Sequence, residues 1–182
     1  MTAIETQRLC LRDWTEADIA PFVRHTNTPE VMRWLGGVLA PEEAEAPVRE
    51  RIMRWQEELG FTFWAMERKT DAELLGFCGL KIAEGDTSPV AGDHEIGWRL
   101  RADAWGQGYA KEAAIASLDF AFGPLAAPHV VALTCIGNEA SWGLMEKLGM
   151  TRRADLDYVD PRFTGELSPT IVYRIERSEW RP

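Results

Sequence analysis

The spacing of apolar residues along the chain predicts seven strands. Residues 8–13 alternate between apolar and charged side chains, with Leu9 and Leu11 set against Arg8 and Arg12, which is typical of a half-buried strand. The other segments with strand patterns are 61–67, 74–83, 94–101, 130–136, 155–159 and 170–176. The polar turn 69–73 predicts that the second and third of these strands form a hairpin.

Helical patterns fill the intervals between these strands. Thr15 followed by Asp18 predicts an N-cap with a capping box, and Pro41 is suited to the first turn of the longest helical segment, which Gly60 ends. The helices expected are 15–25, a short one after Pro29 that stops at Gly36-Gly37, 41–59, 110–122 and 140–148.

This order of elements predicts an α/β or α+β fold with a mixed sheet and crossover helices. The chain has 182 residues and shows no internal repeat, low-complexity tract or linker, so we expect one domain over residues 1–182.

Charge and hydropathy exclude several classes of protein. The net charge of −9 disfavours a general nucleic-acid binder and favours either solubility or attraction of a cationic substrate. No stretch reaches the ~18–20 apolar residues of a membrane span, and residues 1–5 do not resemble a secretory signal. We therefore expect a cytoplasmic protein with no nucleic-acid or membrane partner.

The cysteines and histidines do not suggest a metal or a disulfide framework. Cys10, Cys78 and Cys135 are far apart, and each lies in an apolar strand-like run, which is typical of buried small hydrophobic residues. The three histidines are also scattered, so no metal site is expected.

The segment from Trp105 to Ala110 is the strongest candidate for ligand binding. It connects a predicted strand to a predicted helix, and its two glycines allow the backbone to approach a ligand closely. Free N–H groups at the start of a helix bind anions, so a diphosphate fits this turn. A Gly-rich turn can also be no more than a tight connection.

Four blocks in order resemble the GNAT superfamily of acetyltransferases, and within it the RimJ/RimL-type branch of ribosomal-protein N-terminal acetyltransferases. These blocks are Thr6-Gln7-Arg8-Leu9-Cys10-Leu11-Arg12, His94-Glu95-Ile96-Gly97-Trp98, Trp105 to Ala110 with Glu112-Ala113, and Asn138-x-x-Ser141 with Glu146-Lys147-Leu148-Gly149-Met150. The resemblance covers essentially the whole chain.

The resemblance implies acetyl-CoA as cosubstrate and a sheet that splays between the fourth and fifth predicted strands, with the pantetheine arm in the gap. Backbone groups around Leu100 and Arg101 would hold the pantetheine amides, and Asn138 would bind the arm near the thioester. The pyrophosphate would lie on the N–H groups of Gly106, Gln107, Gly108, Tyr109 and Ala110.

Two positions depart from the superfamily pattern. Its loop commonly begins with glutamine or arginine, where this chain has Trp105, and Lys111 stands where a small hydroxyl residue is common. Lys111 would either add positive charge near the phosphates or point into solvent. Neither departure removes the backbone donors.

Transfer to an amine requires a base for the ammonium proton and benefits from an acid for the departing thiolate. Glu95 is our candidate base, on the same strand face as Gly97, whose missing side chain would leave room for substrate; the alternative is a strand carboxylate paired with Arg99 or another cation. No cysteine has a recognisable base, so direct transfer is expected.

The candidate acid is Ser141. Many superfamily members carry a tyrosine seven positions after the asparagine, but this chain has Met145 there, which cannot donate a proton. A hydroxyl at a helix start can reach the sulfur of coenzyme A, although it can instead satisfy a backbone N–H.

The acceptor remains open at this stage. Trp34, beside Gly36-Gly37, would either line the acceptor pocket or pack in the core. The acceptor is expected to be a small-molecule amine or a protein N-terminus, and a homodimer is compatible with this assignment. The alternatives are a non-catalytic acyl-CoA-binding domain, which Met145 favours, and an enzyme that uses another donor such as succinyl-CoA, for which a basic pair would have to face the acyl group.

Overall fold

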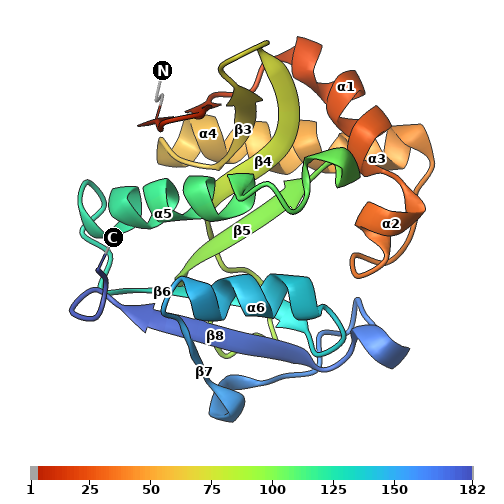
Figure 1. Cartoon of the computed structure of the whole chain (residues 1–182). Coiled ribbons are helices and arrows are strands. Elements are labelled where there is room, and N and C mark those ends of the chain that lie inside the picture. The colour runs from red at the N-terminus through yellow and green to blue at the C-terminus, as the bar shows by residue number, and fades with distance from the viewer. Residues whose placement is uncertain (1–3, 182) are drawn as a thin grey trace.

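A computed structural model describes residues 4–181. Its strands form one eight-stranded sheet in the order β1-β2-β3-β4-β5-β6-β8-β7 (Figure 1). Within the described chain, every neighbouring pair is antiparallel except β5 and β6, so the predicted mixed sheet is confirmed. The strands are β1 Ile4–Glu5, β2 Leu9–Arg12, β3 Phe63–Arg68, β4 Glu73–Ile82, β5 His94–Leu100, β6 His129–Cys135, β7 Thr151–Arg152 and β8 Thr170–Glu176.

The helices begin and end close to the predicted positions. They are α1 Glu16–Thr26, α2 Pro29–Met32, α3 Pro41–Pro47, the π turn η1 Val48–Met53, α4 Arg54–Leu59, α5 Tyr109–Phe122 and α6 Glu139–Lys147. Three short 3₁₀ turns complete the set: η2 Ala102–Ala104, η3 Ala154–Leu156 and η4 Gly165–Leu167. Thr15 precedes α1 with the predicted capping box, in which the Asp18 carboxylate accepts the Thr15 amide at 2.8 Å.

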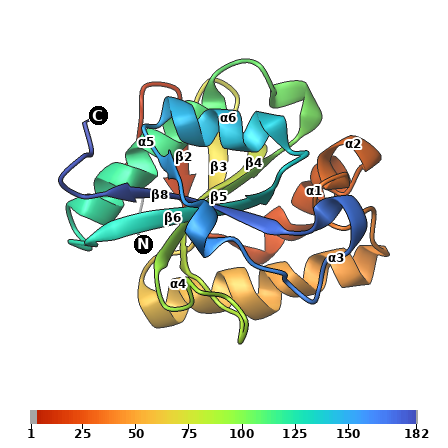
Figure 2. The ribbon, with the colours of Figure 1, turned by 90° about the horizontal axis from the view of Figure 1, so that it is seen from below.

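Helices cover both faces of the sheet (Figure 2). On one face, α5 and α6 pack on side chains such as Trp64, Met66 and Ile96. On the other face, α1 and the α3–η1–α4 run cover Phe63 and Phe77, whose rings stack at 4.9 Å. Successive residues of β3 enter opposite cores because side chains alternate along a strand.

The predicted helix 41–59 is continuous in space but widens in its middle. The turn after Pro47, Val48–Met53, is π-helical, and such turns are often found at functional sites. The Thr62 hydroxyl donates to the Ile52 carbonyl at 2.7 Å, which satisfies a backbone acceptor in this turn. Gly60 ends α4 in the left-handed conformation, as predicted.

The predicted strand 155–159 is wrong. The segment forms the 3₁₀ turn Ala154–Leu156, and Tyr158 makes only an isolated bridge with Thr170. The carboxylate of Asp157 explains the difference, because it accepts Arg152 Nη1 at 2.6 Å and the Val172 amide at 3.1 Å. The side chain thus takes an amide of β8 that a strand would need.

The two-residue strands β1 and β7 were not predicted, since alternation cannot be recognised over so short a length. All three cysteines are free thiols; Cys78 and Cys135 are buried and Cys10 is half-buried.

The sheet opens between β5 and β6. These parallel strands pair at one position, Glu95 opposite Val131, and then separate toward their C-terminal ends (Figure 1). This is the splay expected between the fourth and fifth predicted strands, and it forms a V with Glu95 at its closed end.

Candidate active site

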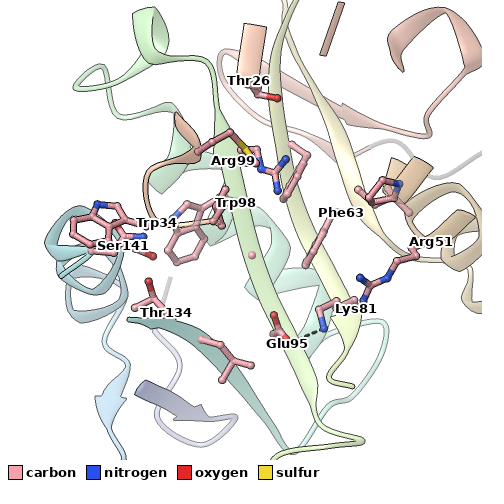
Figure 3. Close-up of a pocket in the computed structure, with 18 of the residues that line it drawn as sticks. Thr26, Trp34, Arg51, Phe63, Lys81, Glu95, Trp98, Arg99, Thr134 and Ser141 are labelled. Carbon is pink, nitrogen blue, oxygen red and sulfur yellow. Dashed lines mark ion pairs between the residues drawn. The ribbon is translucent and has the colours of Figure 1, made fainter. Parts of the chain in front are cut away.

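A cavity of about 430 Å³ opens at the splay. Its walls come from β5, the end of β6 and residues of β3 and β4, from α1, η1 and α6, from the segment after α2, and from residues 158–170. Segments that are far apart in sequence therefore meet where β5 and β6 no longer pair with each other. Figure 3 shows the charged and aromatic side chains that line it.

The loop after β5 presents a row of unpaired backbone amides. Gly106 has φ +71° and Gly108 has φ +81°, and Gly108 is the N-cap of the 14-residue helix α5. Across the described part of the chain, no group accepts a hydrogen bond from the amides of residues 106–111, whereas the Glu112 amide donates to the Gly108 carbonyl at 3.1 Å. Free amides at a helix N-terminus can hold a diphosphate, so these residues fit the predicted cradle.

Arg8, the residue before β2, forms hydrogen bonds with this loop and with the first turn of α5. Glu112 accepts Arg8 Nε at 2.6 Å and the Arg8 amide at 2.8 Å, and Arg8 Nη1 donates to the Gln107 carbonyl at 2.9 Å. Burial opposes ionisation of Glu112, but the hydrogen bonds from Thr6 and Arg8 hold the pKa of its carboxyl below the usual value. The matching blocks contained Arg8 and Glu112, but nothing in the sequence alone indicated that they meet.

Of the two positions predicted to hold pantetheine, Leu100 lies at the open edge of β5, whereas the backbone of Arg101 is bonded within the protein. The Arg101 amide donates to the Leu75 carbonyl at 2.9 Å, and the Leu100 carbonyl accepts Trp105 Nε1 at 3.0 Å. Because backbone groups alternate in direction along a strand, the amides of Trp98 and Leu100 face the gap toward β6. The backbone contacts expected for pantetheine are therefore those of Trp98 and Leu100, and no longer that of Arg101.

Asn138 and Ser141 lie on the opposite side of the V, at the start of α6. Both side chains line the cavity and are half-buried. The Asn138 side chain does not cap the helix, and within residues 4–181 neither it nor the Ser141 hydroxyl makes a hydrogen bond. Ser141 therefore does not satisfy a backbone N–H, which was its structural alternative. Met145 is buried beside them.

Glu95 is a shielded carboxylate at the closed end of the V. Its side chain is 12% exposed and forms an ion pair with Lys81, whose Nζ lies 2.7 Å from Oε2 (Figure 3). Burial raises the pKa of Glu95, and the charge of Lys81 opposes the rise. The ion pair involves Lys81 rather than Arg99, and the raised pKa suits a group that must take up a proton.

The space above Gly97 is not empty. A Cβ atom on Gly97 would lie 2.9 Å from Cζ of Phe63, so the phenyl ring occupies the room that the sequence assigned to substrate. The ring of Trp34 packs against Gly137, which follows β6, because a Cβ atom on Gly137 would lie 2.6 Å from the ring. Trp34 thus lies in the cavity wall, beside α6 (Figure 3).

Sequence analysis missed most of the charged groups in the cavity. Lys81, Arg51, Glu84, Asp160 and Arg162 all line it, and they come from four separate segments. A polar residue such as Lys81 inside the apolar run 74–83 was the available signal, and pairing the 74–83 strand with 94–101 would have placed it opposite Glu95.

Among residues 4–181, no group of three or more histidine, cysteine, aspartate or glutamate side chains is placed to hold a metal ion. No helix in this range is both long and apolar enough to cross a membrane.

Comparison with known proteins identifies the domain. Residues 8–151 match the family model described as "Acetyltransferase (GNAT) domain". The uncharacterised protein YkkB of Bacillus subtilis is 33% identical over 150 residues, which are 82% of this chain and 85% of YkkB. YoaA of the same organism, named an uncharacterised N-acetyltransferase, is 28% identical over 84% of this chain and 85% of YoaA.

Solved structures agree with these relatives. An acetyltransferase from Agrobacterium tumefaciens superposes with a TM-score of 0.78 at 26% identity, over 97% of this chain and 95% of that one. The splayed sheet, the row of free amides and the family match lead to one conclusion: the chain belongs to the GNAT family of acetyltransferases.

Proposed function

We propose that this chain transfers an acetyl group from acetyl-CoA directly to a primary amine. The observation that carries the proposal is the arrangement of the V, which has unpaired amides of residues 106–111 beyond its open end and the buried carboxylate of Glu95 at its closed end. A thioester delivered along the edge of β5 would therefore arrive next to a proton acceptor.

Glu95 is the base. A primary amine is mostly protonated at neutral pH and must lose a proton before it can attack. The raised pKa of Glu95 strengthens its affinity for that proton, and the charge of Lys81 favours the ionised carboxylate that accepts it.

Ser141 is the acid for the departing thiolate, and Asn138 positions the pantetheine arm. Both side chains are free of protein partners in the described structure, which leaves their hydrogen bonds available. Met145 offers no proton at the position where many relatives have tyrosine.

The transfer is direct. Cys135 reaches the cavity, but in the part of the chain that is described no histidine or carboxylate contacts its thiol. Burial raises the pKa of Cys78 to about 12, so that thiol is protonated at neutral pH.

The acceptor is a protein N-terminus or a small amine. The four sequence blocks support the RimJ/RimL-type branch, and the net charge of −9 would attract a cationic amine. Two other functions compete: acyl-CoA binding without turnover, and transfer from another acyl-CoA.

The test has two parts. Acetyl-CoA at ~100 times its dissociation constant should stabilise the folded chain by about 2.7 kcal/mol, which thermal-shift titration measures as a rise in Tm. Release of free coenzyme A is then followed with a panel of peptides, amino acids, polyamines and aminoglycosides. No rise in Tm contradicts cofactor binding, and saturable binding without turnover of any amine favours the non-catalytic alternative.

A further inference from the structure

Within the described structure, Arg99 is the one cation lining the cavity that has no counter-ion. Three other cations that line the cavity each form an ion pair with a carboxylate that also lines it. Those pairs are Lys81–Glu95 at 2.7 Å, Arg51–Glu84 at 2.7 Å and Arg162–Asp160 at 2.6 Å. Among residues 4–181, no carboxylate pairs with Arg99 and its guanidinium makes no hydrogen bond.

The surroundings of Arg99 are aromatic. Its guanidinium carbon lies 5.8 Å from the ring centroid of Phe22 and 5.5 Å from that of Phe77. Burial lowers the pKa of Arg99 to about 10, yet the side chain stays charged at neutral pH. The half-buried charge faces the cavity, where a ligand could supply the opposite charge, and a guanidinium matches carboxylate geometry with two parallel hydrogen bonds.

Arg99 shares a strand face with the candidate base. Glu95, Gly97 and Arg99 point to the α1 side of β5, and Figure 3 shows Glu95 and Arg99 on one strand with the Phe63 ring beside the stretch between them. Four residues of strand separate their Cα atoms by about 13 Å. A ligand with its amine at Glu95, and long enough to pass the Phe63 ring above Gly97, would place its other end near Arg99.

We propose that the acceptor amine carries an anionic group, most simply a carboxylate, that Arg99 binds while Glu95 faces the amine. This inference rests on the proposed function and narrows its acceptor to amino acids, peptides or other amines with an acid group. The amine end would lie at the closed part of the V and the acid end over Phe22 and Phe77.

A carboxylate could also arrive on the donor, as in succinyl-CoA. The position of Arg99 favours the acceptor, because its side chain lies on the face covered by α1 and η1, whereas the free amides of Trp98 and Leu100 lie on the edge toward β6. The experiment separates the two sources.

The test compares amines with and without a carboxylate. Each pair is a dipeptide and its C-terminal amide, or 4-aminobutyrate and butylamine, measured with acetyl-CoA. We expect wild-type kcat/KM to be at least about tenfold higher for the acid member of the preferred pair, as for a hydrogen bond to a charged group. Arg99→Met should bring this ratio to one, mainly through KM, and Arg99→Lys should restore part of it.

Arg54→Met, on the exposed side of α4, is the matched control and should keep the wild-type ratio. Equal kcat/KM for acids and amides in the wild type would overturn the inference while leaving acetyl transfer in place. Arg99→Met that lowers turnover with succinyl-CoA, but leaves acid and amide acceptors unaffected with acetyl-CoA, would assign the carboxylate to the donor. No turnover of any pair would overturn the proposed function and the acceptor role with it.

Discussion

Two regions of the V offer different parts of the chain to a ligand: the loop 106–111 beyond its open end, and the cavity around Glu95 and Arg99. At residues 106–111 the available groups are backbone amides, and Gly106 and Gly108 have no side chains that could block a ligand from them. Around Glu95 and Arg99 the available groups are charged side chains, held by β4, β5 and the π turn of the long helix.

This difference predicts which property each region sets. A backbone cradle can hold the same diphosphate whatever side chains surround it, provided that the glycines remain. A single substitution can change the charge of the cavity around Glu95 and Arg99, so we assign the choice of acceptor to this region.

The largest effect is expected at Glu95. Glu95→Gln keeps the shape but removes the base, so turnover should fall by roughly 10²–10⁴ while acetyl-CoA affinity is retained. The loss should shrink as pH rises, since more amine then arrives unprotonated. A pH–rate profile on one accepted amine measures both, with Glu58→Gln on the exposed face of α4 as control. Unchanged turnover across the range would move the base elsewhere.

A substitution in the cradle should act on affinity instead. Gly108→Val forces a β-branched residue into φ +81° and places its side chain within reach of Arg8, so acetyl-CoA affinity should fall roughly 10- to 100-fold. Calorimetric titration gives the affinity. Gly92→Val, with φ +92° and open space, controls for backbone strain alone. Equal acetyl-CoA affinity in Gly108→Val and the parent would argue against the cradle.

Lys81 should set the pH at which Glu95 works. Its positive charge lowers the pKa of that carboxyl, so Lys81→Met should raise the pKa further. Because the base acts only when deprotonated, the acidic limb of the kcat/KM profile should move to higher pH, with activity recovered in alkali. Lys147→Met on the exposed end of α6 serves as control. A limb that stays in place would exclude this coupling.

The smallest effect is expected at Ser141. Ser141→Ala should lower kcat by about tenfold or less, because the thiolate of coenzyme A can leave unprotonated. The deficit should be greatest at high pH, where solvent supplies fewer protons. Steady-state rates at two pH values, for the parent and the variant, measure it. A deficit that is largest at low pH would argue against an acid role.

The comparison also explains how much could be predicted from the sequence. The loop 105–110 could be recognised because its glycines, the preceding strand and the following helix are contiguous in the chain. Elements with long, regular patterns, such as β4 and α5, were located to within a residue or two. The strand predicted at 155–159 failed because the side chain of Asp157 took the amide of Val172.

The pairing of the charged side chains in the cavity could not be predicted in the same way. Lys81 meets Glu95 through the register of two strands, and Arg51 meets Glu84 across 33 residues of chain. A single sequence does not contain that register. That Arg99 has no partner among residues 4–181 is likewise a property of the assembled cavity, since its own strand carries Glu95 four residues away.

Hydrogen exchange with and without acetyl-CoA tests most directly whether backbone groups hold the donor. We expect saturating acetyl-CoA to slow exchange of the amides of residues 106–111 and of Trp98 and Leu100. In the described structure these amides face open space and not a backbone acceptor. Amides in the hairpin turn 69–73 should exchange as before and serve as the internal reference. Unchanged exchange at residues 106–111 under saturating acetyl-CoA, or protection confined to other segments, would contradict the backbone cradle.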